Sequence, residues 1–288
     1  MKKLIERLLI FIIGIPAVVV LVLYLPFHRN LAMNLVIVFF SAAGALEFSA
    51  MLEKKHIKIP KVESLILGSL IPLAIMLNIS FALPQWIVPA AVMAGAGWAL
   101  MSRIFSRSAE IDTVTNQIIG GFSLLVYPGF FMYWTIKMNV WENPNAILLF
   151  IFITFGSDSI AWLAGTLFGA NNRGIITVSP NKSVAGFIGG IFGSVLVAVA
   201  AVLFFNGALP FYPETSFSSM VLIAVVIGFF TGIAAILGDL AESAMKRSCD
   251  FKDSGNLMLG RGGVLDSIDS IAVAAPVFYM LFSCFFNV

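Results

Sequence analysis

Residues 218–241 read SSMVLIAVVIGFFTGIAAILGDLA, and Asp239 is the only charged residue among them. A run of about 20 apolar residues is long enough to cross the hydrocarbon core of a bilayer as a helix. The rest of the chain has the same character, because 60% of its 288 residues are hydrophobic and only 11% are charged. This composition excludes a soluble globular domain and predicts an all-α, polytopic integral membrane protein.

The hydropathy pattern marks nine such apolar segments. The first follows a basic start and lacks a small-residue cleavage site, so we expect an uncleaved helix rather than a signal peptide. Because no linker or internal repeat is visible, residues 1–288 are expected to form a single membrane domain. About 1–140 would be scaffold helices, and about 145–288 would be helices and cytoplasmic loops that carry the candidate site. The nine segments are 7–27, 31–52, 62–82, 84–101, 118–138, 145–168, 184–206, 218–241 and 264–286.

The distribution of basic residues predicts the orientation of these segments. With the N-terminus in the cytoplasm, 15 of the 17 basic residues fall on the cytoplasmic side, and only Arg29 and Lys137 do not. Nine spans then leave the C-terminus outside. This N-in, C-out topology places the segment 239–269 on the cytoplasmic side, where nucleotides are found.

Residues 239–269 read DLAESAMKRSCDFKDSGNLMLGRGGVLDSID and hold ten of the 32 charged residues. Charges in or beside spans cost about 2.5–3.5 kcal/mol each on insertion scales, so a concentration of them indicates function. Asp239 precedes Glu242 by three residues, and Asp266 precedes Asp269 by three, so each pair shares a helix face. Carboxylates that converge beside basic groups suit Mg²⁺, which binds oxygen ligands and substrate phosphates.

Basic residues and glycines in the same segment suit phosphate binding. Glycines let backbone N–H groups approach a phosphate closely, and an arginine adds a bidentate donor. The alternative is a solvated loop that follows the positive-inside rule. A solvated loop accounts for Lys246 and Arg247. It does not account for Asp239, Asp266 and Asp269, which the predicted spans place near the bilayer. The residues concerned are Ser243, Lys246, Arg247, Lys252, Asp253, Gly260, Arg261, Gly262 and Gly263.

Asp158 lies inside an apolar segment between Ser157 and Ser159. It could bond these hydroxyls, but intramembrane carboxylates are by default functional candidates. Further along, Ser179 and Lys182 precede an apolar segment, and a helix N-terminus beside a lysine suits an anion. A capped helix with a snorkelling lysine is the alternative. Glu47, in the second segment, is equally consistent with a structural role and with a place in the site.

The C-terminal pattern resembles that of phosphatidate cytidylyltransferases, also called CDP-diacylglycerol synthases. The family signature runs Ser-x-x-Lys-Arg, four residues, Lys-Asp, a glycine turn and Asp-x-x-Asp. The upstream residues Asp158, Phe168-Gly169 and Ser179-Pro180-Asn181-Lys182 resemble a second family pattern. The residues that match the signature are Ser243, Lys246, Arg247, Lys252, Asp253, Gly260, Gly262, Gly263, Asp266 and Asp269.

Three positions of this C-terminal signature depart from the family pattern. Arg261 stands where the family has His, Ser267 where it has Arg, and Leu259 where it has Pro. Arginine keeps a positive charge but cannot exchange a proton at neutral pH as histidine does. These departures bear on the activity rather than on family membership.

The resemblance implies transfer of a cytidylyl group from CTP to phosphatidic acid, which yields CDP-diacylglycerol and pyrophosphate at the inner membrane. Asp158, Asp239, Asp266 and Asp269 would hold Mg²⁺, with a second cation left open, and the basic residues would hold phosphates. A homodimer is also left open, and no feature indicates a nucleic-acid partner. The alternatives are an impaired relative that binds lipid or nucleotide, a cytidylyltransferase for another lipid phosphate, and a transporter.

Overall fold

The computed structural model describes residues 10–104, 111–205, 207–210, 216–258 and 262–286. Over these ranges the chain forms helices joined by turns and loops, with two isolated antiparallel bridges and no strand. It divides into two compact units. Unit 1 comprises Met1–Val140 and Lys246–Ile268, and unit 2 comprises Trp141–Met245 and Asp269–Val288. The expectation of a single membrane domain stays a prediction.

Seven helices in the described ranges are long and apolar enough to cross a membrane, which confirms the prediction of an all-α, multi-pass membrane protein. Two shorter apolar helices, Ile12–Leu23 and Ile87–Met101, coincide with the first and fourth predicted segments. The start of the first segment lies outside the described residues. The count of nine spans and the N-in, C-out orientation stay predictions. The seven helices are Phe27–Lys54, Lys61–Phe81, Asp112–Trp141, Pro144–Phe168, Val184–Phe204, Phe217–Ser248 and Leu265–Phe286.

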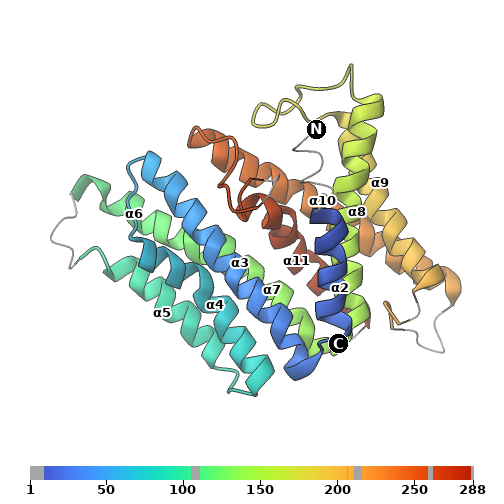
Figure 1. Ribbon diagram of the computed structural model, residues 1–288, viewed down its shortest axis with the longest axis horizontal. Helices are drawn as coiled ribbons and strands as arrows, with labels where there is room; N and C mark the ends of the chain where they lie inside the picture. The colour runs from blue at the N-terminus through green and yellow to red at the C-terminus, as the bar shows by residue number, and fades with distance from the viewer. Residues whose placement is uncertain (1–9, 105–110, 206, 211–215, 259–261, 287–288) are drawn as a thin grey trace. The chain divides into compact units, whose positions relative to one another are not determined.

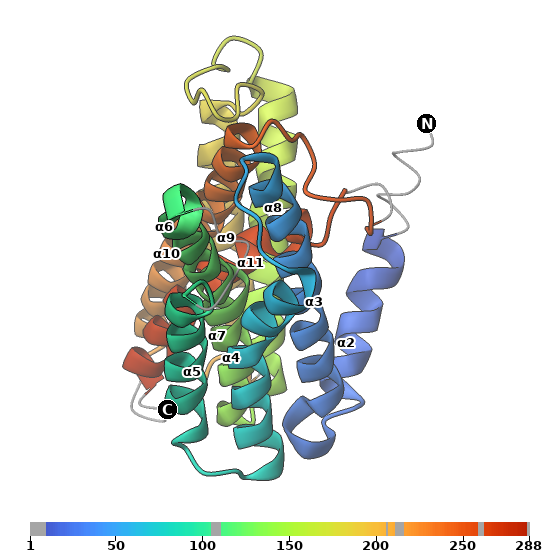
Figure 2. The same cartoon turned by 90° about the vertical axis from the view of Figure 1, so that its left-hand side faces the viewer.

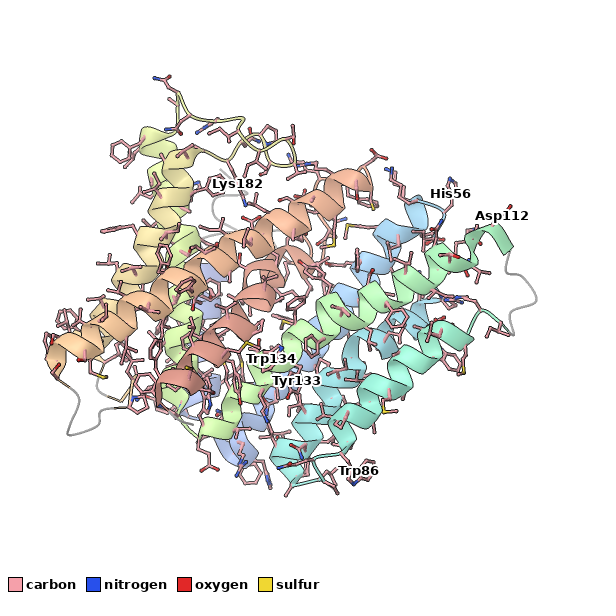
Figure 3. The ribbon with its side chains drawn as sticks, turned by 180° about the vertical axis from the view of Figure 1, so that it is seen from behind. His56, Trp86, Asp112, Tyr133, Trp134 and Lys182 are labelled. Carbon is pink, nitrogen blue, oxygen red and sulfur yellow. The ribbon has the colours of Figure 1, made fainter. Side chains whose placement is uncertain are left out.

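The N-terminal helices build unit 1, where α3, α4, α5 and α6 pack beside one another (Figure 1). A short turn joins α4 to α5, which lie side by side in Figure 2. His56 and Asp112 lie at one end of this unit and Trp86 at the other (Figure 3). The elements are η1 Ile10–Gly14, α2 Ile15–Leu23, α3 Phe27–Lys54, α4 Lys61–Phe81, α5 Ile87–Met101, α6 Ile111–Leu124, η2 Leu125–Phe130, α7 Phe131–Lys137 and η3 Met138–Trp141.

The right-handed part of α3 begins at about Leu31, as the sequence predicts, because His28, Arg29 and Asn30 have positive φ angles. A buried amide network follows this turn. Asn30 donates to Asn139 over 2.7 Å, and Asn139 donates to Asn34 over 2.8 Å. Buried amides are costly unless they are hydrogen-bonded, so this network stabilises the packing of α3 against η3.

A close approach of α3 to α4 depends on Gly68. A Cβ added to Gly68 would collide with the Ala45 side chain and come within 3.1 Å of the Ser41 carbonyl oxygen. The Ser41 hydroxyl lies 2.7 Å from the Gly68 carbonyl and also contacts the Pro128 carbonyl. Small residues at helix contacts let backbones approach closely in membranes, where apolar burial adds little to association.

Unit 2 contains α8 Pro144–Phe168, α9 Val184–Phe204, and most of α10 Phe217–Ser248 and α11 Leu265–Phe286. Asn143 caps α8 by accepting from the Ala146 amide, and Ser183 caps α9 by accepting from the Gly186 amide. Helices α8 and α9 lie side by side (Figure 1). A Cβ on Gly193 of α9 would come within 2.7 Å of the Gly156 carbonyl oxygen of α8. Glycine therefore sets this helix spacing too.

Replacing Gly68 by alanine tests the α3–α4 contact. We expect Gly68→Ala to lower the free energy of unfolding by about 1–3 kcal/mol, because the added methyl overpacks the contact. Gly97→Ala in α5 is the matched control, since a Cβ there meets nothing within 4 Å. Helix propensity should make the control neutral or stabilising by up to about 1 kcal/mol. Thermal unfolding in detergent measures the stability of both variants. Equal unfolding midpoints for Gly68→Ala and Gly97→Ala would contradict a close contact of α3 with α4 at Gly68.

Candidate functional site

Unit 2 gathers four carboxyl groups from three helices. Asp158 comes from α8, Asp239 and Glu242 come from α10, and Asp269 comes from the first turns of α11. The other three are the acidic neighbours of Asp269. Glu242 and Asp269 are buried, whereas Asp158 and Asp239 are half-buried. The structure thus brings together three of the four predicted metal ligands and adds Glu242, which the spacing analysis paired with Asp239.

Close helix packing makes this gathering possible. Gly238 of α10 lies against the backbone of Asp269, and a Cβ there would come within 3.1 Å of the Asp269 carbonyl carbon. On the following residue of α11, the Ser270 hydroxyl lies 3.5 Å from the Asp158 carboxylate. Helices α8, α10 and α11 are therefore connected at the level of the carboxyl groups.

Lys182 brings a positive charge to the same cluster. Its ammonium group forms an ion pair with Asp239, and the two side chains are 25% and 34% exposed. Figure 3 shows Lys182 at the end of the loop between α8 and α9. Backbone hydrogen bonds order this loop, including that from the Lys182 amide to the Ser179 carbonyl over 3.0 Å. Ser179, the other predicted residue of the loop, is half-buried.

A second cluster lies in unit 1 and centres on Asp266. Lys246 forms an ion pair with Asp266 Oδ1, and these side chains are only 11% and 9% exposed. The other carboxylate oxygen, Oδ2, accepts from the amides of Ser254 and Gly263 and from the Ser254 hydroxyl, each over 2.8 Å. Asp266 thereby joins the loop that follows α10 to the start of α11.

Glu47 of α3 reaches into this second cluster. Its carboxylate accepts from the amides of Val264 and Leu265 over 2.9 Å each and lies 3.0 Å from the Ser254 hydroxyl. The sequence left Glu47 open between a structural and a site role, and a carboxylate in an apolar span was its only signal. Ser254 was missed altogether, because a serine in a polar loop has no distinguishing pattern.

The remaining predicted residues are in less enclosed positions. Ser243 is half-buried, and Arg247, Lys252 and Asp253 are exposed. Arg247 donates to the Phe251 carbonyl over 3.1 Å. Gly262 has a φ of +104° and pairs with Met258 in an antiparallel bridge. Gly260, Arg261 and Leu259 lie outside the described residues.

The carboxylates of unit 2 fit Mg²⁺ by their chemistry. Magnesium prefers oxygen ligands and is commonly held by one or two carboxylates together with substrate phosphates. In the described part of the chain, no three His, Cys, Asp or Glu side chains stand in an arrangement that could hold a metal ion by themselves. The type of donor suits the ion, whereas the arrangement of these side chains does not by itself form a metal site.

The fold and the two clusters define a multi-pass helical membrane protein with paired acidic and basic groups on its C-terminal helices and on the loop before α9. The cytidylyltransferase family model matches residues 5–285, and the chain belongs to this family. The resemblance inferred from the signature residues is thereby confirmed.

Several curated relatives carry the name phosphatidate cytidylyltransferase. The one from Bacillus subtilis (strain 168) is 30% identical over 177 residues, which is 60% of this chain and 62% of the relative. The one from Haemophilus influenzae is 37% identical over 133 residues, 46% and 44% of the two chains. The one from Staphylococcus aureus (strain COL) is 34% identical over 140 residues, 49% and 50%. The matched part thus spans between 44% and 62% of these relatives.

Replacing Lys246 tests the second cluster. We expect Lys246→Met to lower the free energy of unfolding by about 1.5–3 kcal/mol, because a hydrogen bond to a buried charged group is lost. Arg247→Met is the control, since the neighbouring side chain is exposed. It should change stability by no more than about 0.5 kcal/mol. Denaturant titration in detergent measures both variants. Equal losses of stability in Lys246→Met and Arg247→Met would contradict a stabilising role for the buried Lys246–Asp266 ion pair.

Proposed function

We propose that this chain transfers a cytidylyl group from CTP to phosphatidic acid and releases pyrophosphate, which makes CDP-diacylglycerol. The observation that carries the proposal is the family match over residues 5–285. The curated relatives named above bear the name of this activity, and the two Lys–Asp clusters lie on the segments that resemble the family patterns. An apolar chain that encloses such clusters suits a lipid substrate and a charged co-substrate.

The proposed reaction needs no nucleophile from the protein. A phosphate oxygen of the lipid attacks the α-phosphorus of CTP in line, the bond to the β-phosphate oxygen breaks, and pyrophosphate leaves. Such transfers depend on positioning and on neutralisation of phosphate charge. The protein's contribution is therefore to hold two anionic substrates against each other at the edge of the bilayer.

In this proposal Asp239 and Asp269, with Asp158 beside them, hold Mg²⁺ in unit 2. The ion would neutralise charge on the triphosphate and on the leaving pyrophosphate. Lys182 already pairs with Asp239, so it is placed to bind a phosphate that approaches these carboxylates. Asp266 stays a predicted fourth ligand, although its carboxylate already accepts from Ser254 and Gly263 in unit 1.

The exposed cations Arg247 and Lys252 are proposed to bind phosphate from solution, and Lys246 to do so from its buried position beside Asp266. Ser179, Ser243, Asp253 and residues 260–263 stay predicted substrate contacts. The positive-inside distribution supports a site on the cytoplasmic face of the inner membrane. The acyl chains of the lipid would remain in the bilayer.

Pyrophosphate release tests the function directly. Purified protein in detergent, given CTP and phosphatidic acid, should release pyrophosphate with Mg²⁺ and none with EDTA. Each substrate omitted singly provides the control. CTP binding without release would contradict the proposal and identify an impaired relative. Release with only a different lipid phosphate would move the assignment to another cytidylyltransferase.

Asp269→Asn tests the carboxylate cluster. We expect turnover to fall at least about 100-fold, because the amide removes a charge that the proposed ion requires. The thermal midpoint should not fall, since the substitution relieves repulsion from Asp158, Asp239 and Glu242. Asp112→Asn, at an exposed position near the start of α6, should keep full activity. A fully active Asp269→Asn variant would remove this residue from the site.

A further inference from the structure

Glu47 caps a helix to which it does not belong. The first amides of a helix have no intrahelical acceptor, and a side chain just before the helix usually supplies one. Val264 precedes α11 and its carbonyl accepts the first helical bonds, but valine has no side-chain oxygen. The Glu47 carboxylate from α3 accepts from the Val264 and Leu265 amides instead, and its negative charge suits the positive end of the helix dipole.

Ser254 connects this cap to Asp266. The Ser254 hydroxyl lies 3.0 Å from Glu47 Oε2 and 2.8 Å from Asp266 Oδ2, and the residue is only 4% exposed. A hydroxyl carries one hydrogen and can accept two bonds. The Asp266 amide also donates to it over 3.3 Å. Any shift of Glu47 therefore changes the hydrogen bonds available to Asp266.

The loop is packed against Glu47 without spare room. A Cβ on Gly255 would come within 2.7 Å of the Glu47 carboxyl carbon, and one on Gly263 would collide with Glu47 and Ser254. By contrast, Lys55, the C-cap of the same helix, pairs with Asp250 at a position where both side chains are 45% or more exposed. Exposed pairs of this kind contribute little, and Lys54 reaches the Asp250 carbonyl only over 3.4 Å at an exposed position, so Glu47 is the buried contact by which α3 holds the loop.

We infer that Glu47 is a positioning residue of the proposed transfer reaction. It fixes Ser254 and the first turn of α11, and through them it orients the carboxylate of Asp266 and the paired ammonium group of Lys246. The catalytic part of this inference rests on the proposed function, whereas the structural part does not. The experiment therefore has one arm for each.

Hydrogen exchange in detergent measures the structural arm. In Glu47→Gln one of the two carboxylate oxygens becomes an NH2 group that cannot accept a hydrogen bond, so at least one of the Val264 and Leu265 amides should exchange about tenfold faster than in the wild type. Glu53→Gln, at an exposed position of the same helix, should leave their exchange unchanged. Unchanged exchange in Glu47→Gln would overturn the inference, whatever the protein's activity.

Turnover measures the catalytic arm. We expect kcat to fall about 10–100-fold in Glu47→Gln, with KM for CTP changed less than about threefold, because the residue supports other groups rather than substrate. Ser254→Ala should cause a similar loss, and the double variant should lose no more than the worse single one. If the losses of kcat in the two single variants multiply in the double variant, the inference that Glu47 acts through Ser254 is overturned.

Two controls keep the arms separate. If the wild type does not release pyrophosphate, the proposed function fails while hydrogen exchange still decides whether Glu47 holds the loop. If Glu47→Gln does not accumulate as a folded protein, Ser254→Ala alone carries the test. Wild-type kcat in that variant would overturn the inference, and a loss of kcat at an unchanged thermal midpoint would support it.

Discussion

The cost of placing a carboxylate in or beside lipid is the constraint on which this structure depends. A buried charge is tolerated only when a cation or several hydrogen-bond donors compensate it. Asp239 has Lys182, and Asp266 has Lys246 together with three donors from the loop. These contacts in turn require the loops to take one path, so the same constraint orders the segments before α9 and α11.

The constraint also explains why glycine stands at the tightest contacts. The Gly263 amide donates to Asp266, and its α-carbon faces Ser254 and Glu47 with no space for a side chain. The sequence predicts that this glycine binds phosphate, because glycines permit close approach of the backbone. In the structure the close approach is to the protein's own carboxylates and hydroxyl, which accounts for the residue without a ligand.

Hydropathy predicted the helices well because their apolar composition is a property of each segment alone. The predicted segment 31–52 begins where α3 leaves its positive-φ turn, and 264–286 begins one residue before α11. Contacts between segments that lie far apart in the sequence could not be predicted in this way. The approach of Glu47 to Ser254 joins residues 207 positions apart, and neither belongs to a recognisable pattern. The spacing of Asp266 and Asp269 was visible, but their different surroundings were not.

The two carboxylates in the first turns of α11, those of Asp266 and Asp269, have different neighbours. A carboxylate offers about four lone-pair sites, two on each oxygen. Three donors already surround Oδ2 of Asp266, so this oxygen has no capacity left, and Oδ1 is held by Lys246. A cation that reached Asp266 would have to take the place of Lys246. Asp269 instead has acidic neighbours, and a cation there would relieve repulsion rather than displace a partner. Residues three positions apart on one helix thus suit different tasks, the first to order the loop and the second to attract positive charge.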